Sequence, residues 1–444
     1  MTPDSGTARP LSGVNFESVR PRAVSTRAVS THAVLAALLL LSVAACTAPP
    51  KPAPAPAPTR THPKVPARVV GYFTDWGVYA RDYQVKDVET GGSAAELTDL
   101  VYAFGQVKGG ACAPGDAWAD YQKPMSAADS IDGVADDPKA AVKGDFGQLI
   151  KLKARHPDLR LIWSFGGWNG SDGFDDAARD PAAFASSCRA LLEDSRWRGL
   201  FDGIDIDWEY PNACGLTCDK SGSDAFGRVL AALRTALGPD ALVTAAVPAD
   251  VGKLRRTDYA AATRSANWLS AMTYDYFGTG SDDGGGGDPA DLHRTEPHSP
   301  LTAYPGIPRS TANAEATVDE LLGLGVPASK LLLGIGFYGR GWSGVTGAGV
   351  GSAASGPAAG KYEGGLEEYE LLVKRCPPTG MVGGTAIAHC GSQWWSYDTP
   401  ETIRTKMTYA RSKALGGAFA WELSGDTADA VLLKAVASGL NPES

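Results

Sequence analysis

The sequence predicts a (β/α)8 barrel of the TIM type. Three observations support this: short apolar runs recur along the chain, amphipathic segments lie between them, and the length suits eight such units. The chain has 444 residues, of which 43% are hydrophobic and 20% charged, so it can bury a large core and is not globally disordered. Strands that alternate with helices form parallel βα units, and eight units over about 370 residues fit a barrel with insertions. A doubly wound sheet is the alternative, but no G-x-G-x-x-G motif follows the first predicted strand.

Residues 1–45 are predicted to be a signal or leader peptide. Several arginines precede the apolar run 33–45, which is shorter than the ~20 residues that span a bilayer but suits a signal peptide. The run ends in Val43-Ala-Ala-Cys46, which resembles the lipobox of bacterial lipoproteins, where the Cys is lipidated and becomes the mature N-terminus. An ordinary signal peptide cleaved near Ala45 is the alternative. We expect export, either to the outer face of the cell membrane through a lipid on Cys46 or into the medium.

Residues 46–66 follow as a tether. Pro and Ala alternate in this stretch, which favours an extended polyproline-like spacer of about 60 Å. The folded domain is then expected at 67–440.

The eight predicted strands are short apolar runs. They are 68–73, 100–104, 159–165, 203–207, 242–246, 268–272, 331–335 and 417–421. Between the fourth and the fifth, residues 226–237 place Leu, Val and Ala at helical spacing, and Gly238-Pro239 ends the pattern. A long stretch with a Gly-, Ala- and Ser-rich part at 344–360 separates the last two strands. We expect a small inserted α+β subdomain at about 343–393, and a long ordered loop is the alternative.

Charge and cysteine content bear on partners and cofactors. The net charge of −9 with no basic block argues against nucleic acid. The chain has neither a C-x-x-C nor an H-x-x-x-H pattern, so we expect no metal and no cofactor. Apart from Cys46, an even number of cysteines behind an export signal suggests disulfides. Cys214–Cys218 and Cys376–Cys390 each close a short loop with Gly or Pro, and Cys112–Cys188 follows by elimination.

The segment 201–211 contains a strand with three carboxyl groups. Side chains along a strand alternate, so one face carries acids and the other carries apolar groups: Asp205, Asp207 and Glu209 against Ile204, Ile206 and Trp208. Like charges at close range raise at least one pKa, which provides the protonated acid that a glycosidase needs for its leaving group. Glu209 comes last, at the end of the strand where barrel enzymes place their chemistry. On alternation alone, a divalent-metal site is the alternative.

Residues 201–209 resemble the D-G-x-D-x-D-x-E signature of family-18 glycoside hydrolases, the chitinase family. Five further segments resemble motifs of this family in chain order: Ser164-Phe-Gly-Gly-Trp168, Met272-Thr-Tyr-Asp275, Gly336-Phe-Tyr-Gly-Arg-Gly-Trp342, Trp394-Trp-Ser-Tyr-Asp398 and Gly417-Ala-Phe-Ala-Trp421. The last two resemble the eighth-strand region of bacterial chitinases. The resemblance spans roughly 68–435.

The resemblance implies a role for each matching residue. Glu209 would act as general acid and then as base. Asp207 would hold the substrate's acetamido N–H and exchange a hydrogen bond with Glu209. Asp205 would hold a proton that tunes Asp207, and Tyr274 would donate to the acetamido oxygen. The implied binding residues are Tyr72, Phe104, Ser164, Gly167, Trp168, Met272, Asp275, Tyr338, Arg340, Trp342 and Trp421. Among them, Tyr72 and Ser164 would assist Asp205, Trp421 would floor the sugar subsite beside the scissile bond, and Trp168 and Trp342 are candidate aromatic platforms.

The resemblance also implies substrate-assisted catalysis. The substrate's own N-acetyl oxygen attacks the anomeric carbon, so the configuration is retained and no second carboxylate acts as nucleophile, an exception among glycosidases. We therefore expect a monomeric chitinase that hydrolyses β-1,4 links in chitin and chito-oligosaccharides. One alternative is an endo-β-N-acetylglucosaminidase acting on glycoprotein glycans, against which Tyr338, Arg340 and the insertion favour chitin. The other is a catalytically inactive chitin-binding lectin, against which the presence of Glu209 argues.

Overall fold

The computed structural model of the chain describes residues 67–279 and 293–442. The predicted leader, the tether and Cys46 lie outside the described residues. Within those two ranges, no helix has the length and apolar character needed to cross a membrane.

Eight parallel strands form the closed barrel that the sequence predicts. They are β1 (Arg68–Thr74), β2 (Asp99–Lys108), β4 (Arg160–Gly166), β5 (Gly203–Asp207), β6 (Leu242–Val247), β7 (Trp268–Ala271), β8 (Leu331–Gly336) and β15 (Gly417–Trp421). Neighbours pair in the order β1-β15-β8-β7-β6-β5-β4-β2, and β1 also pairs with β2, which closes the barrel. All eight predicted strands are confirmed. The short strand β3 (Ala111–Ala113) extends the sheet as a hairpin on β2.

Each strand is buried on both faces, which explains the nearly continuous apolar runs in the sequence. On β1, Val70 and Tyr72 belong to the cluster inside the barrel. Val69 and Phe73 alternate with them and belong to the layer between strands and helices. The period of two therefore separates an inner core from an outer one.

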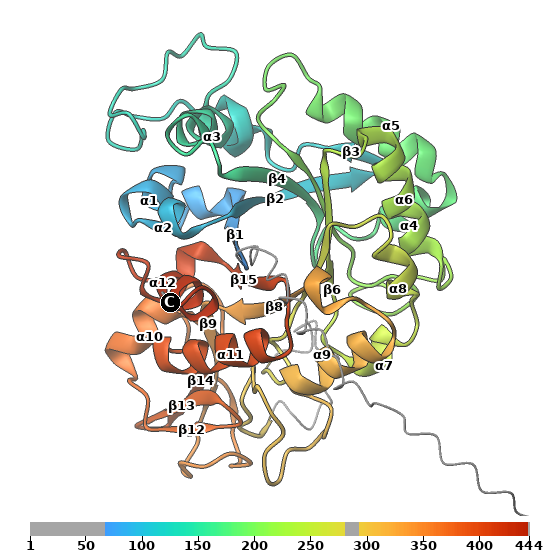
Figure 1. Cartoon of the computed structure of the whole chain (residues 1–444). Helices are drawn as coiled ribbons and strands as arrows, with labels where there is room; N and C mark the ends of the chain where they lie inside the picture. The colour runs from blue at the N-terminus through green and yellow to red at the C-terminus, as the bar shows by residue number, and fades with distance from the viewer. Residues whose placement is uncertain (1–66, 280–292, 443–444) are drawn as a thin grey trace, which may run out of the picture. The chain divides into compact units, whose positions relative to one another are not determined.

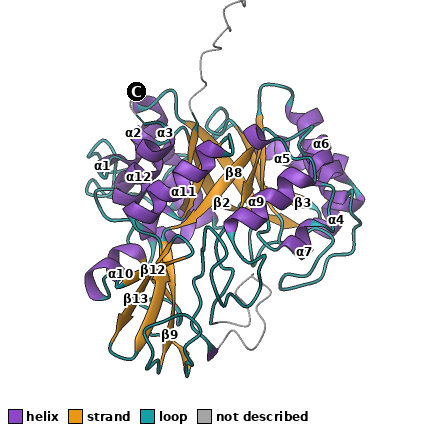
Figure 2. Cartoon of the chain, turned by 60° about the horizontal axis from the view of Figure 1, so that its bottom comes forward, coloured by secondary structure: helices purple, strands orange, loops and turns teal. Residues whose placement is uncertain are grey.

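Helices cover the outside of the barrel (Figures 1 and 2). They are α1 (Val85–Thr90), α2 (Ser93–Glu96), α3 (Gly144–Arg155), α4 (Phe174–Arg179), α5 (Pro181–Leu192), α6 (Ala225–Leu237), α7 (Val251–Leu254), α8 (Tyr259–Ala262), α9 (Ala314–Gly323), α11 (Pro400–Ser412) and α12 (Val431–Leu440). Short turns are η1 (Asp75–Val78), η2 (Trp118–Gln122), η4 (Ala328–Lys330) and η5 (Leu423–Gly425). The predicted helix is confirmed as α6. It ends at Gly238, whose φ of +85° favours glycine.

An antiparallel sheet with one helix is inserted between β8 and β15. Its elements are β9 (Tyr338–Ser343), β10 (Gly356–Pro357), β11 (Leu366–Glu368), α10 (Tyr369–Arg375), β12 (Gly380–Val382), β13 (Thr385–Cys390) and β14 (Gln393–Tyr397). The strand order is β10-β9-β14-β13-β12, with β11 also on β9. In Figure 2 this sheet projects from one end of the barrel.

The insertion is wider than the predicted range 343–393. Only Phe337 separates β9 from barrel strand β8, and β9 pairs with β14 through Trp342 and Trp394. The segment Trp394–Asp398, assigned above to the eighth-strand region, therefore begins within the insertion sheet. The eighth barrel strand is β15 alone.

All three predicted disulfides are present: Cys112–Cys188, Cys214–Cys218 and Cys376–Cys390. The first joins β3 to α5, and the third ties the end of α10 to β13 within the insertion. The second closes a loop of the chain just beyond β5.

Candidate active site

The catalytic strand β5 shows the predicted alternation. Ile204, Ile206 and Trp208 are buried in the layer between strands and helices. Asp205 and Asp207 therefore face the barrel interior, and both are buried. Glu209 follows directly beyond the C-terminal end of the strand and is partly exposed at the wall of a pocket.

Asp205 lies deepest and accepts three hydrogen bonds from hydroxyl groups. Tyr72 and Ser164 donate to its Oδ2 at 3.0 and 2.8 Å, and Thr244 donates to its Oδ1 at 2.5 Å. Burial raises the pKa of Asp205, while the three donors act in the opposite direction because they stabilise the carboxylate. Tyr72 and Ser164, expected among the binding residues, are buried and do not line the pocket, so their contact is with Asp205. Thr244 was not predicted.

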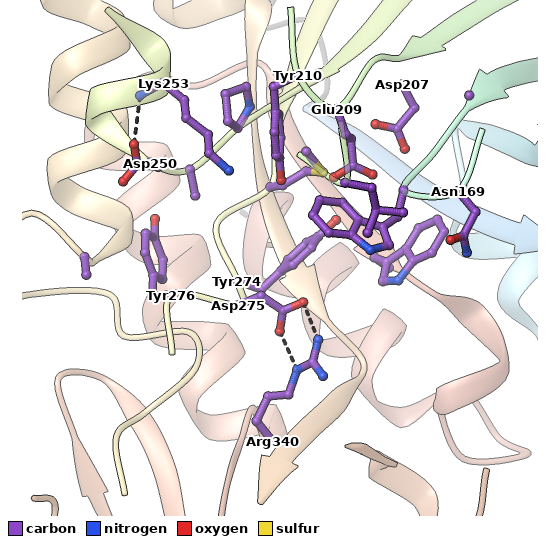
Figure 3. Close-up of a pocket in the computed structure, with 18 of the residues that line it drawn as sticks. Asn169, Asp207, Glu209, Tyr210, Asp250, Lys253, Tyr274, Asp275, Tyr276 and Arg340 are labelled. Carbon is purple, nitrogen blue, oxygen red and sulfur yellow. Dashed lines mark hydrogen bonds and ion pairs between the residues drawn. The ribbon is translucent and has the colours of Figure 1, made fainter. Parts of the chain in front are cut away.

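Asp207 has the strongest reason to hold a proton. Burial raises its pKa well above the ordinary range, and the neighbouring charges of Glu209 and Asp205 raise it further. Its Oδ1 is buried without a hydrogen-bond partner in the described part of the chain. Asp207 and Glu209 line the same pocket (Figure 3), and the hydrogen bond expected between their carboxyl groups stays a prediction.

Glu209 has a pKa raised to about 7, chiefly by burial. The hydroxyl of Tyr210 and the charge of Lys253 act against this rise, and the charge of Asp275 adds to it. The backbone of Glu209 is held as well, because its N–H donates to Ser171 Oγ at 2.9 Å and this hydroxyl donates to the Gly167 carbonyl at 2.9 Å. Near neutral pH, Glu209 can therefore both give and take a proton.

The pocket has a volume of about 570 Å³. The predicted residues that line it are Phe104, Trp168, Asp207, Glu209, Met272, Tyr274, Asp275, Arg340 and Trp421. Trp421 stacks on Phe104 with ring centroids 5.7 Å apart and meets Trp76 at 6.3 Å. These rings form an apolar surface on which the C–H face of a sugar can pack.

A fixed ion pair lies beside this surface. Arg340 donates from Nε and Nη2 to the two oxygens of Asp275 at 2.9 and 3.0 Å, and His298 Nδ1 lies 3.5 Å from Asp275 Oδ1 (Figure 3 shows the Arg340 bonds). Burial opposes ionisation of Asp275, but Arg340 and His298 outweigh it and hold its pKa well below the ordinary range. Asp275 is therefore a permanent negative charge near Glu209.

Besides Tyr72 and Ser164, three further predicted binding residues do not line the pocket. Trp342 is fully buried on β9, its ring 5.6 Å from that of Trp394, so it offers no face to a sugar and the platform assignment is corrected. Tyr338 is buried beside the ring of Tyr274. Gly167 acts through its missing side chain: a Cβ there would lie 2.6 Å from the Phe104 ring.

Several pocket residues were not predicted: Trp76, Asn169, Tyr210, Leu216, Asp250, Lys253, Tyr276, Arg309, Thr311 and Glu363. Trp76, Tyr210 and Lys253 lie just beyond the C-terminal ends of β1, β5 and β6. The rule that barrel enzymes build their sites from these ends could have found them. Arg309 and Glu363 lie far from any barrel strand end in the chain and carry no local signal. In the described ranges, no three His, Cys, Asp or Glu side chains are grouped to hold a metal ion.

Comparisons with known proteins agree with this geometry. The model of the family "Glycosyl hydrolases family 18" matches residues 68–426. Chitinase C of Streptomyces lividans is 53% identical over 364 residues, which is 81% of this chain and 57% of the relative. Chitinase 63 of Streptomyces plicatus is 52% identical over 375 residues, 84% of this chain and 60% of the relative. The chain thus spans less than two thirds of the length of these curated relatives.

Among solved structures, the catalytic domain of psychrophilic chitinase B from Arthrobacter TAD20 is similar, with 31% identity and a TM-score of 0.77. The match covers 85% of this chain and 96% of that one. The matched family residues extend from the first barrel strand to beyond the last and include the whole carboxylate strand. The chain therefore belongs to family 18 of the glycosyl hydrolases.

Proposed function

We propose that this protein is a chitinase that hydrolyses β-1,4 links in chitin and chito-oligosaccharides, acting as a monomer without a cofactor. The observation that carries this proposal is the position of Glu209, whose carboxyl group has a pKa of about 7 at the wall of a pocket that Trp421 also lines. The names of the two Streptomyces relatives support the same activity.

In the proposed reaction, Glu209 donates its proton to the glycosidic oxygen while the bond from this oxygen to the anomeric carbon breaks. The acetamido oxygen of the same sugar forms a new bond to that carbon, giving an oxazolinium-like intermediate. Asp207 Oδ1 accepts the acetamido N–H, and the hydroxyl of Tyr274 donates to the acetamido oxygen. The Glu209 carboxylate then takes a proton from water, while the water oxygen bonds to the anomeric carbon and the bond from that carbon to the acetamido oxygen breaks. This second displacement restores the starting configuration.

The proton on the catalytic strand is best placed on Asp207. The family resemblance assigns it to Asp205, but the three hydroxyl donors around Asp205 favour its ionised form. Asp207 lies between two other carboxyl groups of the same strand face, and its pKa is raised well above the ordinary range by burial and by them. A proton on Asp207 reduces the repulsion that Glu209 would meet when it ionises during the reaction.

The test of this function is the Glu209→Gln variant assayed on chitohexaose and colloidal chitin. We expect hydrolysis to fall by about 10²- to 10⁴-fold, because the amide cannot transfer a proton, while oligosaccharide binding by calorimetry persists. Glu193→Gln, on an exposed glutamate at the end of α5, should keep full turnover. Retention of more than about a tenth of the wild-type rate in Glu209→Gln would exclude its role as the acid. Cleavage of glycoprotein glycans with chito-oligomers left intact would assign the protein to the endo-β-N-acetylglucosaminidases.

We also propose that the protein is exported and anchored by a lipid on Cys46, with 47–66 as its tether. The support is the sequence alone: the apolar run 33–45, the lipobox-like end at Cys46 and the Pro/Ala alternation that follows.

A further inference from the structure

The chain beyond Glu209 forms a small loop closed by the Cys214–Cys218 disulfide. Within it, Gly215 N–H donates to the Thr217 carbonyl at 2.8 Å, and Cys214 and Cys218 pair as an antiparallel bridge. The Thr217 hydroxyl donates to Asp172 at 2.8 Å, which ties the loop to the segment after Trp168. A bridge across four residues removes little entropy from the unfolded chain compared with one across 76. Its main consequence is therefore a fixed local shape.

This loop packs against the catalytic acid and against Trp168. A Cβ on Gly215 would lie 2.3 Å from the Glu209 carbonyl oxygen and 3.4 Å from the Trp168 ring. Only glycine therefore fits at position 215 so close to the Glu209 carbonyl. The loop backbone also supports the edge of the Trp168 ring. Trp168 in turn lies 6.3 Å from the ring of Tyr210, the residue after the acid.

Leu216 lies at the tip of the loop. It lines the catalytic pocket, and yet 48% of its surface is exposed. A leucine held in this position by a disulfide leaves apolar surface facing water until something covers it. Because the pocket is continuous from Trp421 past Glu209 to Trp168 and Leu216, the substrate is the occupant that can reach it.

Besides Tyr274 and Tyr276, two separate groups of aromatic rings line the pocket. Trp421, Phe104 and Trp76 contact one another, whereas the ring contact of Trp168 among the described residues is with Tyr210. If the sugar whose anomeric carbon is attacked packs on Trp421, the sugar on the leaving-group side of the scissile bond lies at Trp168 and Tyr210. Figure 3 shows Tyr210 directly beside Glu209 at this wall.

We propose that the Cys214–Cys218 loop is a specificity-determining part of the groove, in which Leu216 extends the Trp168 surface to bind an N-acetylglucosamine unit on the leaving-group side. This inference rests on the proposed function. The disulfide holds Leu216 in its binding position before the substrate arrives, so the ordering cost of the loop is not taken from the binding free energy.

The test compares two probes of opposite sides of the acid. End-labelled chitohexaose reports which bond is cleaved, and a chitobiose-derived thiazoline, which mimics the cyclised intermediate, fills only the Trp421 side. For Leu216→Ser we expect KM for chitohexaose to rise about fivefold, because a half-exposed leucine contributes less to substrate binding than a fully buried apolar side chain does. We expect kcat to change little, and thiazoline affinity to stay within about twofold of wild type. Cleavage should shift away from binding modes of chitohexaose that place two sugars on the leaving-group side.

Two controls isolate the loop. Ile150→Ser removes an aliphatic side chain of similar exposure, 43%, on α3 outside the pocket, and should change neither KM nor the cleavage pattern. Replacing Cys214 and Cys218 together by Ser should reproduce the shifted pattern, whereas replacing Cys376 and Cys390 together by Ser should not. If the first double variant does not fold, Leu216→Ser alone decides.

An unchanged KM and cleavage pattern in Leu216→Ser would overturn the inference. An equal loss of thiazoline affinity would overturn it as well, because Leu216 would then act on the Trp421 side. A wild-type protein that leaves chitohexaose intact would instead overturn the proposed function, and this inference with it.

Discussion

The pH dependence of catalysis follows from the charges around Glu209. The reaction needs its protonated form, and its pKa of about 7 places the alkaline limb of kcat/KM at about that pH. The protonated share falls from about ten elevenths one pH unit below the pKa to about one eleventh one unit above it. We therefore expect kcat/KM to fall about tenfold between pH 6 and pH 8, with the limb belonging to the coupled pair of Glu209 and Asp207.

Replacing Lys253 tests whether Glu209 sets this pH dependence. Its ammonium lies 3.9 Å from the Tyr210 ring centroid, lines the same pocket, and lowers the pKa of Glu209 by its charge. Lys253→Met keeps the approximate length of the side chain and removes its charge. The pKa of Glu209 therefore rises, and the alkaline limb of kcat/KM moves to higher pH. A single charge that acts on Glu209 from the wall of the same partly screened pocket is worth roughly half to one pKa unit. At pH 8 this increases the protonated share about three- to fivefold.

The assay is kcat/KM of a soluble chito-oligomer between pH 5 and 9, with the limb midpoint as readout because it is independent of any loss in binding. Arg255→Met removes a cation on the same turn that pairs with Glu320 outside the pocket and should leave the midpoint in place. A limb that stays fixed or moves down in Lys253→Met would refute the assignment of this limb to Glu209.

Three further predictions concern the nucleophile, the anchor and the stability of the fold. A chito-oligomer with glucosamine only at the donor position should resist cleavage, as should fully deacetylated chitosan, and efficient hydrolysis would mean that a protein carboxylate is the nucleophile. Cys46→Ser should move the exported protein from the detergent phase to the aqueous phase, and unchanged partitioning would contradict a lipid anchor. Lys406→Met removes the cationic partner of Asp398, 2.6 Å away in a buried pair, and should lower the free energy of unfolding in urea by about 3–5 kcal/mol; a loss below about 1 kcal/mol would show that this ion pair contributes little to the stability of the fold.

The barrel and the catalytic strand could be predicted because their signals are local. A strand buried on both faces is an apolar run wherever it lies, and the alternation along 203–209 determines which side chains share a face. The pairing of β9 with β14 has no such signal, because it joins segments far apart in the chain. The predicted range of 343–393 was therefore narrower than the insertion itself.

The same distinction applies to the site. Tyr274 and Trp421 were identified from motifs, and both line the pocket. Trp342 matched a motif equally well, yet its ring faces Trp394 in the insertion sheet. A motif reports the residue type and not the direction of the side chain, which depends on the sheet that the strand joins. Thr244 was missed for a related reason: its contact with Asp205 is made across two neighbouring strands.

The closure of the barrel has a consequence for the synthesis of the chain. Arg68 on β1 pairs with Gly417 on β15, and Ala67 and Asn441 exchange hydrogen bonds between backbone and side chain. Until β15 has left the ribosome, the sheet has two open edges, at β1 and at β8, and the pocket lacks Trp421. Contacts between such distant segments form slowly, and open edges invite aggregation. A fragment that stops short of Gly417 should accumulate in inclusion bodies, whereas a permutant that joins residue 67 to residue 441 and opens the chain elsewhere should remain soluble.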